Sequence, residues 1–369
     1  MKTKEKLNIS FFGSSILSAY WNGAATYYRG IVKSLYQQGH SITFYEPDVY
    51  DRQSHRDIEN PEYCEVIVYP EDRVNLKALL RKAQEESDII IKTSGVGVFD
   101  EFLEAEVPKL KHSDNLIIFW DVDAPATLDR MDNNMNDPFR DQLPLYDLVL
   151  TYGGGNPVIN AYKKFGAKAC FPIYNALDTD THHPGKHLEK YEAALNFLGN
   201  RLPDREERVI EFFDKPARSL PDKKFIIGGS GWKDFNFPEN VVYAGHIYTK
   251  DHNSFNSSPM AVLNISRESM FRYGFSPATR VFEAAGAAAC IITDYWEGID
   301  FFFEPDIEIL VAKDGDEVTE ILRLLTPERA KEIGKAAYKK VLEKHTYKQR
   351  AKVLEKILQE SLSKTKIKI

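Results

Sequence analysis

The sequence predicts an α/β protein made of two domains, each with a parallel sheet. Short apolar runs typical of buried strands alternate with segments of helical period along the 369 residues. Several of these runs end directly in glycine-rich turns. A helix normally connects one parallel strand to the next, so the alternation favours doubly wound sheets. The length suits two domains of ordinary size.

The first half of the chain opens with a βαβ unit. A strand is expected at residues 7–12, followed by a glycine turn, a helix over about 23–38 and a strand at 41–45. The turn at 13–18 lacks the second and third glycines of the dinucleotide-binding fingerprint, so it is weak evidence for such a site. The rest of this half is expected to contain a helix at 75–86, strands at 88–92, 115–120 and 147–151, and a helix at 158–165.

The second half repeats the alternation after an aperiodic stretch. Residues 176–192 carry three histidines and a Pro-Gly pair, and we expect them to be the interdomain linker. The predicted domains are therefore 1–175 and 193–343, with a C-terminal crossing helix and tail at 344–369. Strands are expected at 194–198, 225–227, 241–244, 260–265 and 290–293, with a helix at 206–213 and another that starts at Thr326-Pro327-Glu328.

The segment 274–294 has the most informative pattern. Ser276 is a good N-cap and Pro277 a good first helical residue, so a helix is expected to start at Pro277. Arg280 and Glu283 then share one face. Free N–H groups and a guanidinium suit a phosphate, and a carboxylate one turn further on can accept hydrogen bonds from a ribose diol. The alternative is a solvated Arg–Glu pair, which is common on helices.

The same segment resembles a known family. It resembles the donor half of the two-lobed (GT-B) glycosyltransferases, and more narrowly the CgeB-like (spore maturation protein) group within the glycosyl transferases group 1 family. The His345-Thr346-Tyr347 ending followed by Arg350 also matches this group. The residues that carry the main resemblance are Pro277, Arg280, Phe282, Glu283, Ala284, Gly286, Asp294, Gly298 and Phe303-Glu304-Pro305.

The resemblance implies a GT-B fold, with two Rossmann-like domains facing a cleft and C-terminal helices that cross back to the first domain. It implies that Glu283 holds the ribose of a nucleotide diphosphate sugar and that the helix start faces the diphosphate. UDP-sugar is the expected donor by analogy alone. Many retaining members have an earlier glutamate where this chain has Phe275, so retaining or inverting chemistry stays open.

The donor site is expected to stabilise the departing diphosphate without metal, with Arg280 as the catalytic arginine. Turns at the strand ends of the second domain should line it. The turn at 245–247 is expected to read the nucleobase, or else to be a plain turn. The predicted donor residues are Gly199, Asn200, Arg201, Arg205, Gly245, His246, Ile247, Arg267, Ser276, Thr279, Arg280 and Glu283.

The first domain is expected to bind the acceptor. Asp121 and Asp123 follow a buried strand, where paired acids could hold a metal as in the single-domain (GT-A) glycosyltransferases. They alternate about Val122 and should point to opposite faces. Asp121 is therefore expected to be the catalytic acceptor carboxylate, with a structural cap as the alternative. The predicted acceptor or diphosphate loop comprises Gly13, Ser14, Ser15, Asn22 and Asp123.

Composition and the spacing of cysteines and histidines argue against several other classes of protein, in the case of nucleic-acid binding only weakly. A net charge of −7 argues against nucleic acid as the main partner. The three cysteines are far apart and odd in number, which predicts buried thiols rather than disulfides or zinc. The histidines of the linker lack other ligands at metal spacing, so no metal or cofactor is expected.

No signal peptide or spanning segment is evident, which predicts a cytoplasmic protein. The tail at 364–369 is expected to be solvated, or at most a weak peripheral membrane contact. The predicted function is transfer of a sugar from a nucleotide diphosphate sugar to a sugar, protein or small-molecule acceptor. A sugar-nucleotide epimerase of the same fold and a non-catalytic nucleotide-sugar binding protein are the alternatives.

Overall fold

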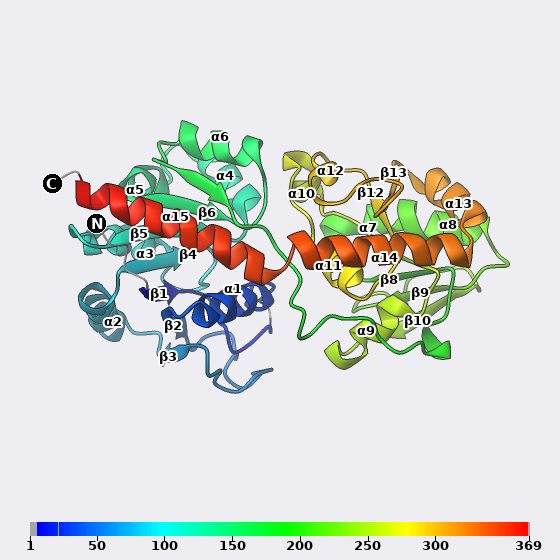
Figure 1. Ribbon diagram of the computed structural model, residues 1–369, viewed down its shortest axis with the longest axis horizontal. Helices are drawn as coiled ribbons and strands as arrows, with labels where there is room; N and C mark the ends of the chain where they lie inside the picture. The colour runs from blue at the N-terminus through cyan, green and yellow to red at the C-terminus, as the bar shows by residue number, and fades with distance from the viewer. Residues whose placement is uncertain (1–5, 21, 368–369) are drawn as a thin grey trace. The chain divides into compact units, whose positions relative to one another are not determined.

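The computed structural model describes residues 6–20 and 22–367, and the last part of the predicted tail, 368–369, lies outside them. The chain forms two compact units (Figure 1). The first combines the chain up to Tyr174 with the segment that starts at Tyr347, and the second is Asn175–Thr346. Each unit contains its own parallel sheet with helices around it, which confirms the predicted α/β architecture.

The sheet of the first unit has seven strands in the order β3-β2-β1-β4-β5-β6-β7, all paired in parallel. The strand order reverses beside β1, as in other doubly wound sheets. Strands β4 and β5 are buried along their whole length, which explains their continuous apolar sequences. The strands are β1 (Asn8–Phe12), β2 (Ser41–Pro47), β3 (Glu65–Tyr69), β4 (Ile89–Thr93), β5 (Leu116–Asp121), β6 (Leu148–Thr151) and β7 (Cys170–Pro172).

Helices cover this sheet, and the last helix of the chain belongs to them. Helix α15 packs beside α1, so the expected return of the C-terminal segment to the first domain is confirmed (Figure 1). Gly30 makes the contact close, since a Cβ atom there would lie 2.2 Å from the ring of Tyr347. The longer helices of this unit are α1 (Ala25–Gln37), α2 (Arg73–Glu86), α3 (Asp100–Glu106), α4 (Ala124–Asn133), α6 (Asn156–Lys164) and α15 (Tyr347–Ile367).

The second unit has a six-stranded parallel sheet in the order β10-β9-β8-β11-β12-β13. Its core gathers apolar side chains from these strands and from the helix over 203–219. All five strands predicted for this half are present, and β13 is an additional one. The strands are β8 (Leu195–Leu198), β9 (Phe225–Gly228), β10 (Val241–Gly245), β11 (Ala261–Asn264), β12 (Ile291–Asp294) and β13 (Leu310–Ala312).

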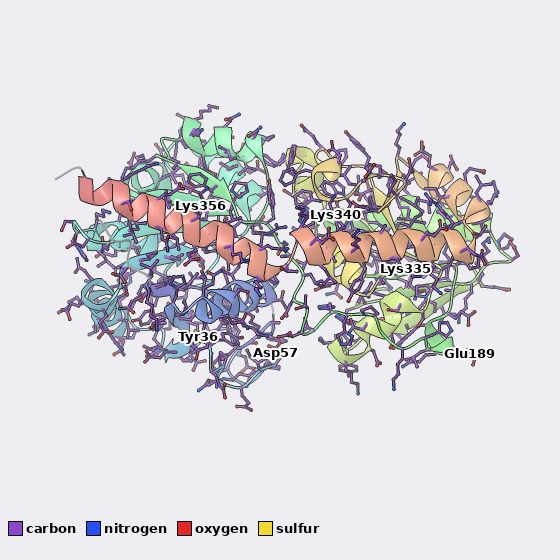
Figure 2. All side chains as sticks on the ribbon, in the orientation of Figure 1. Tyr36, Asp57, Glu189, Lys335, Lys340 and Lys356 are labelled. Carbon is purple, nitrogen blue, oxygen red and sulfur yellow. The ribbon has the colours of Figure 1, made fainter. Side chains whose placement is uncertain are left out.

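The helices of the second unit lie between these strands in sequence. Thr326 caps α14 by accepting a hydrogen bond from the N–H of Arg329, as expected for a helix that starts at Pro327. Lys335 on α14 and Lys356 on α15 are exposed (Figure 2). The main helices are α7 (Pro203–Val209), α8 (Lys215–Ser219), α9 (Thr249–Ser257), α10 (Glu268–Tyr273), α11 (Thr279–Gly286), α13 (Gly315–Leu324) and α14 (Pro327–Lys344).

The predicted start of the helix at Pro277 is wrong by two residues. Helix α11 begins at Thr279, and its N-cap residue is Ala278, which has an extended backbone conformation with a ψ of 146°. Pro277 therefore lies before the helix. The hydroxyl of Ser276 donates to the carbonyl of Gly274 at 2.9 Å, so it stabilises the preceding loop. A serine committed to its own loop does not cap the helix.

The segment expected as a linker packs within the second unit. The hydroxyl groups of Ser257 and Ser258, at the end of α9, accept hydrogen bonds from the N–H groups of Gly185 and Leu188, at 3.0 and 2.9 Å. The three cysteines are free and buried, which confirms the prediction for them. Among the described residues, no helix is both long and apolar enough to cross a membrane.

Candidate functional site

Two arginines converge at the carboxyl end of the second sheet. Arg205 lies on α7, Arg280 lies on α11, and both approach Gly199 at the end of β8. A Cβ atom added to Gly199 would lie 2.9 Å from Nη1 of Arg205 and 3.3 Å from Nη2 of Arg280. The glycine therefore leaves room for two guanidinium groups at the edge where α/β sheets bind their ligands.

Arg280 is held in place beside a second positive charge, while Glu283 and Asp294 each act on it more weakly than Arg205 does. Its Nη1 donates to Oδ1 of Asn264 at 3.4 Å, and its guanidinium carbon lies 5.5 Å from the ring centre of Phe197. Burial, and then the nearby charge of Arg205, lower the pKa of Arg280 to about 10. An anion bound between the two arginines would relieve this repulsion.

A fully buried carboxylate at the same edge of the sheet, Asp294, is paired with another arginine. Asp294, at the end of β12, accepts from Nη2 of Arg208 at 2.5 Å and from the N–H of Ser266 at 3.0 Å. Burial raises the pKa of Asp294, and Arg208 opposes that shift. Asp294 thus forms its ion pair with Arg208 and acts on Arg280 only at longer range.

Glu283 lies one turn after Arg280 on α11. Its side chain is 23% exposed, and Oε1 lies 3.8 Å from Nε2 of His182. The negative charge of Glu283 also raises the pKa of Arg280, which shows that the two groups are close. A partly exposed carboxylate close to the guanidinium group of Arg280 can accept hydrogen bonds from hydroxyl groups of a ligand.

The predicted turn at 245–247 lies at the end of β10. Gly245 has a φ of 71°, a left-handed conformation that favours glycine, and its carbonyl accepts from the N–H of Gly229 at 2.8 Å. Ile247 is buried, and its carbonyl lies 3.1 Å from Nε2 of His252. The rings of His246 and Tyr248 meet edge to face with centres 4.7 Å apart.

The other predicted donor residues support the loops around this edge. Oδ1 of Asn200 accepts from the N–H of Ser230 at 2.9 Å. Arg201 forms a two-point ion pair with Glu206, with contacts of 2.8 and 2.5 Å. Arg267 is the N-cap residue of α10, and Thr279 is the first residue of α11.

Asp121, at the corresponding edge of the first sheet, is in a different situation. Its side chain is fully buried and accepts hydrogen bonds from the hydroxyl of Ser94 at 2.7 Å, the N–H of Asp123 at 2.8 Å and the hydroxyl of Tyr162. These contacts match the structural alternative for Asp121 and not a carboxylate that meets an acceptor. Asp123 is exposed and is the N-cap residue of α4.

Apart from the exposed Asp123, the residues of the predicted acceptor loop are buried, and their side chains are hydrogen-bonded to one another or to β2. The hydroxyl of Ser14 donates to Oδ1 of Asn22 at 2.9 Å, and that of Ser15 donates to Oε1 of Glu46 at 3.0 Å. The amide of Asn22 donates to the carbonyl of Ser15 at 2.7 Å. A Cβ atom on Gly13 would lie 2.5 Å from the ring of Phe44, so only glycine fits there. The polar side chains of this loop therefore stabilise its backbone conformation.

Sequence reasoning missed two histidines beside Glu283. His182 comes from the segment expected as a linker, and His252 comes from α9. Their rings lie 6.0 Å apart. No local pattern marks either residue, since the contact depends on how distant segments pack. Within the described ranges, no group of three or more His, Cys, Asp or Glu side chains is placed to hold a metal.

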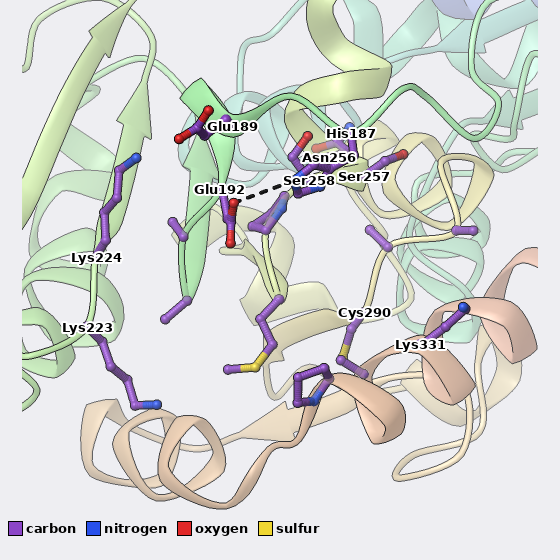
Figure 3. Close-up of a pocket in the computed structure, with 18 residues that line it drawn as sticks. His187, Glu189, Glu192, Lys223, Lys224, Asn256, Ser257, Ser258, Cys290 and Lys331 are labelled. Atoms are coloured by element: carbon purple, nitrogen blue, oxygen red, sulfur yellow. Dashed lines mark ion pairs between the residues drawn. The ribbon is translucent and has the colours of Figure 1, made fainter.

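A cavity of about 850 Å³ lies elsewhere in the second unit (Figure 3). It opens beside the first residues of β8, β9, β11 and β12, at the amino-terminal edge of the sheet. His187 and Glu192 form an ion pair of 3.5 Å in its wall. None of the predicted donor residues lines it, and ligands of such sheets bind at the opposite edge.

Comparison with known proteins agrees with this architecture. Residues 205–356 match the family model described as glycosyl transferase-like. This stretch contains Arg205, Arg280 and Glu283. No curated protein matches the sequence significantly.

Several solved structures share the fold. A sucrose-phosphate synthase from Thermosynechococcus elongatus superposes with a TM-score of 0.69 at 13% identity, over 97% of this chain and 100% of that one. HepE from Anabaena, solved in complex with UDP-glucose, gives 0.64 at 12% identity over 96% and 100%. The T4 phage β-glucosyltransferase with its UDP-glucose substrate gives 0.58 at 15% identity over 97% and 99%. The chain thus has the GT-B fold of glycosyltransferases.

Proposed function

We propose that this protein is a metal-independent glycosyltransferase, of the CgeB-like group, that uses a nucleotide diphosphate sugar as donor. The observation that carries the proposal is the convergence of Arg205 and Arg280 on Gly199. Two like charges brought together at a ligand-binding edge favour a ligand with at least two negative charges. A nucleoside diphosphate leaving group has that charge.

In the proposed reaction the bond between the sugar C1 and the β-phosphate oxygen breaks. The acceptor hydroxyl oxygen bonds to C1, and its proton passes to a base. Arg280 and Arg205 stabilise the charge that develops on the departing diphosphate. The N-terminal end of α11 adds N–H groups and a positive dipole end.

The remaining parts of the donor are assigned to neighbouring groups. Glu283 accepts hydrogen bonds from the ribose diol, and the turn 245–247 reads the nucleobase with its backbone. UDP is the proposed nucleotide because two proteins of the same fold were solved with UDP-glucose. On the acceptor side, we propose the exposed Asp123 rather than the buried Asp121.

The function can be tested by measuring UDP release from UDP-glucose, UDP-galactose and UDP-N-acetylglucosamine, with EDTA present. Acceptor mixtures of sugars, peptides and small alcohols are added or withheld. We expect wild-type protein to release UDP in an acceptor-dependent way and Arg280→Met to release almost none. Conversion of the donor sugar without UDP release would indicate an epimerase. Tight binding of UDP-sugars without any turnover would indicate a binding protein.

A further inference from the structure

His182 is a buried ring with one nitrogen directed at the proposed ribose site. Its side chain is 9% exposed, and Nε2 lies 3.8 Å from Oε1 of Glu283. Over the described parts of the chain, this nitrogen finds no hydrogen-bond partner within ordinary distance. A buried polar atom without a partner is costly and calls for an explanation.

The rest of the histidine is fixed by its own segment. Its N–H donates to the carbonyl of Asp178 at 3.0 Å, and Nδ1 lies 3.0 Å from the hydroxyl of Thr181. Its carbonyl is close to α11, since a Cβ atom on Gly286 would lie 3.2 Å from it. Because the backbone and Nδ1 are both held, the ring can turn little, and Nε2 stays directed at Glu283.

The segment that carries His182 is in turn anchored to α9. The amide of Asn253 donates to the carbonyl of Thr181 at 3.0 Å, and its Oδ1 accepts from the N–H of His183 at 3.3 Å. The side chain of Asn253 therefore bonds the chain on both sides of His182. Such double anchoring suits a residue whose position must be maintained.

We propose that His182 is a positioning residue that orients the carboxylate of Glu283 for the ribose diol of the donor. This inference rests on the proposed nucleotide site. Because Oε1 already lies 3.8 Å from Nε2, a hydrogen bond between these two atoms would leave Oε2 of Glu283 for the hydroxyl groups of the ligand. The histidine fixes one oxygen so that the other is available to hydroxyl groups.

His252 lies near His182, but its Nε2 bonds to the carbonyl of Ile247 and not to Glu283. Burial lowers the pKa of His252, so its ring is neutral at physiological pH. Because its Nε2 lies 3.1 Å from the carbonyl of Ile247, the proton of the neutral ring belongs on Nε2. His252 therefore holds the base-reading turn, and His182 is the histidine that meets the ribose carboxylate.

The test compares UDP with 2′,3′-dideoxyuridine diphosphate, which lacks both hydroxyl groups of the diol. Affinities of both nucleotides are measured by calorimetry for wild type, His182→Ala, His182→Gln and Glu283→Gln. His183→Ala is the matched control, because His183 is the exposed neighbour on the same segment. Melting temperatures without ligand show whether each variant is folded.

We expect wild type to prefer UDP and His182→Ala to bind UDP roughly tenfold more weakly while binding the dideoxy nucleotide as wild type does. Glutamine, whose amide can donate near the position of Nε2, should restore part of the loss. Adding His182→Ala to Glu283→Gln should cost little more, because both act on one interaction. His183→Ala should behave like wild type.

Equal loss of affinity for both nucleotides in His182→Ala would mean a general structural role and would overturn the inference while leaving the proposed function standing. Unchanged UDP affinity in His182→Ala would also overturn the inference and leave the proposed function standing. Should the alanine variant fail to fold, His182→Gln carries the same comparison, and loss for both nucleotides again overturns it. If wild type binds neither UDP nor GDP, ADP or TDP, the proposed function fails, and this inference fails with it.

Discussion

The carboxyl ends of the two sheets occupy equivalent places in their units, but the charged groups there differ in their surroundings. At the first sheet, Asp121 is fully buried and accepts hydrogen bonds from three different groups. At the second sheet, Arg280 and Arg205 stand side by side, and their repulsion helps to lower the pKa of Arg280. A charge whose bonds are all made inside the protein stabilises the fold. Like charges placed side by side at a sheet edge raise the local positive potential, which favours an anionic ligand.

This comparison predicts the largest stability change at Asp121. Asp121→Ala leaves the N–H of Asp123 and the hydroxyl groups of Ser94 and Tyr162 without their acceptor, and should lower the free energy of unfolding by about 3 kcal/mol. Urea denaturation measures this change. UDP affinity of the folded variant should be unchanged, and a selective loss of UDP binding without loss of stability would return Asp121 to the active site.

For Arg280 we expect the reverse of Asp121, namely weaker UDP binding with unchanged stability. Arg280→Met removes a charge-assisted contact to phosphate and should weaken UDP binding by about 2 kcal/mol, or roughly 30-fold. The ligand-free protein should keep its melting temperature, since burial beside Arg205 already opposes the charge of Arg280. Calorimetry and a thermal melt check the two parts. Arg218→Met, which removes an arginine paired with Asp214 in the same unit, is the control and should bind UDP normally.

The lowered pKa of Arg280 predicts a smaller effect of pH. In the proposed site the cationic form of Arg280 binds the diphosphate, so we expect its contribution to be complete below about pH 9 and to fall as the pH rises through about 10. Affinity for UDP should drop about twofold at pH 10 from this group alone. Arg280→Met, measured over the same range, removes the contribution of Arg280 and leaves the titration of the ligand itself. Identical pH profiles for the two proteins would contradict this account.

Much of the fold could be predicted because it depends on local patterns. Fully buried strands such as β4 and β5 read as continuous apolar runs, and Thr326 with Pro327 marks a helix start by its chemistry. The edge strand β3 is only partly buried and was not predicted, although its sequence Glu-Val-Ile-Val-Tyr consists mainly of residues that favour strands. The start of α11 was misplaced because Ser276 bonds to Gly274, a competition that spacing does not reveal.

Only those residues of the candidate site that belong to a sequence motif or a strand-end turn could be proposed from the sequence. The structure brings Arg205 and Arg280 together at the carboxyl edge of the second sheet, and it places Glu283 close to Arg280. The burial of Asp121 depends on Tyr162 from α6 and Ser94 from the loop after β4, which no pattern around Asp121 reveals. The partnership of His182 with Glu283 likewise depends on tertiary packing.

The central claim is that a nucleoside diphosphate binds at the carboxyl edge of the second sheet without metal. It is tested most directly by titrating UDP into wild type, Glu283→Ala and Asp121→Asn by calorimetry in the presence of EDTA. The account predicts that wild type and Asp121→Asn bind UDP alike and that Glu283→Ala binds roughly tenfold more weakly. Binding that needs a divalent metal, survives Glu283→Ala and disappears in Asp121→Asn would contradict it.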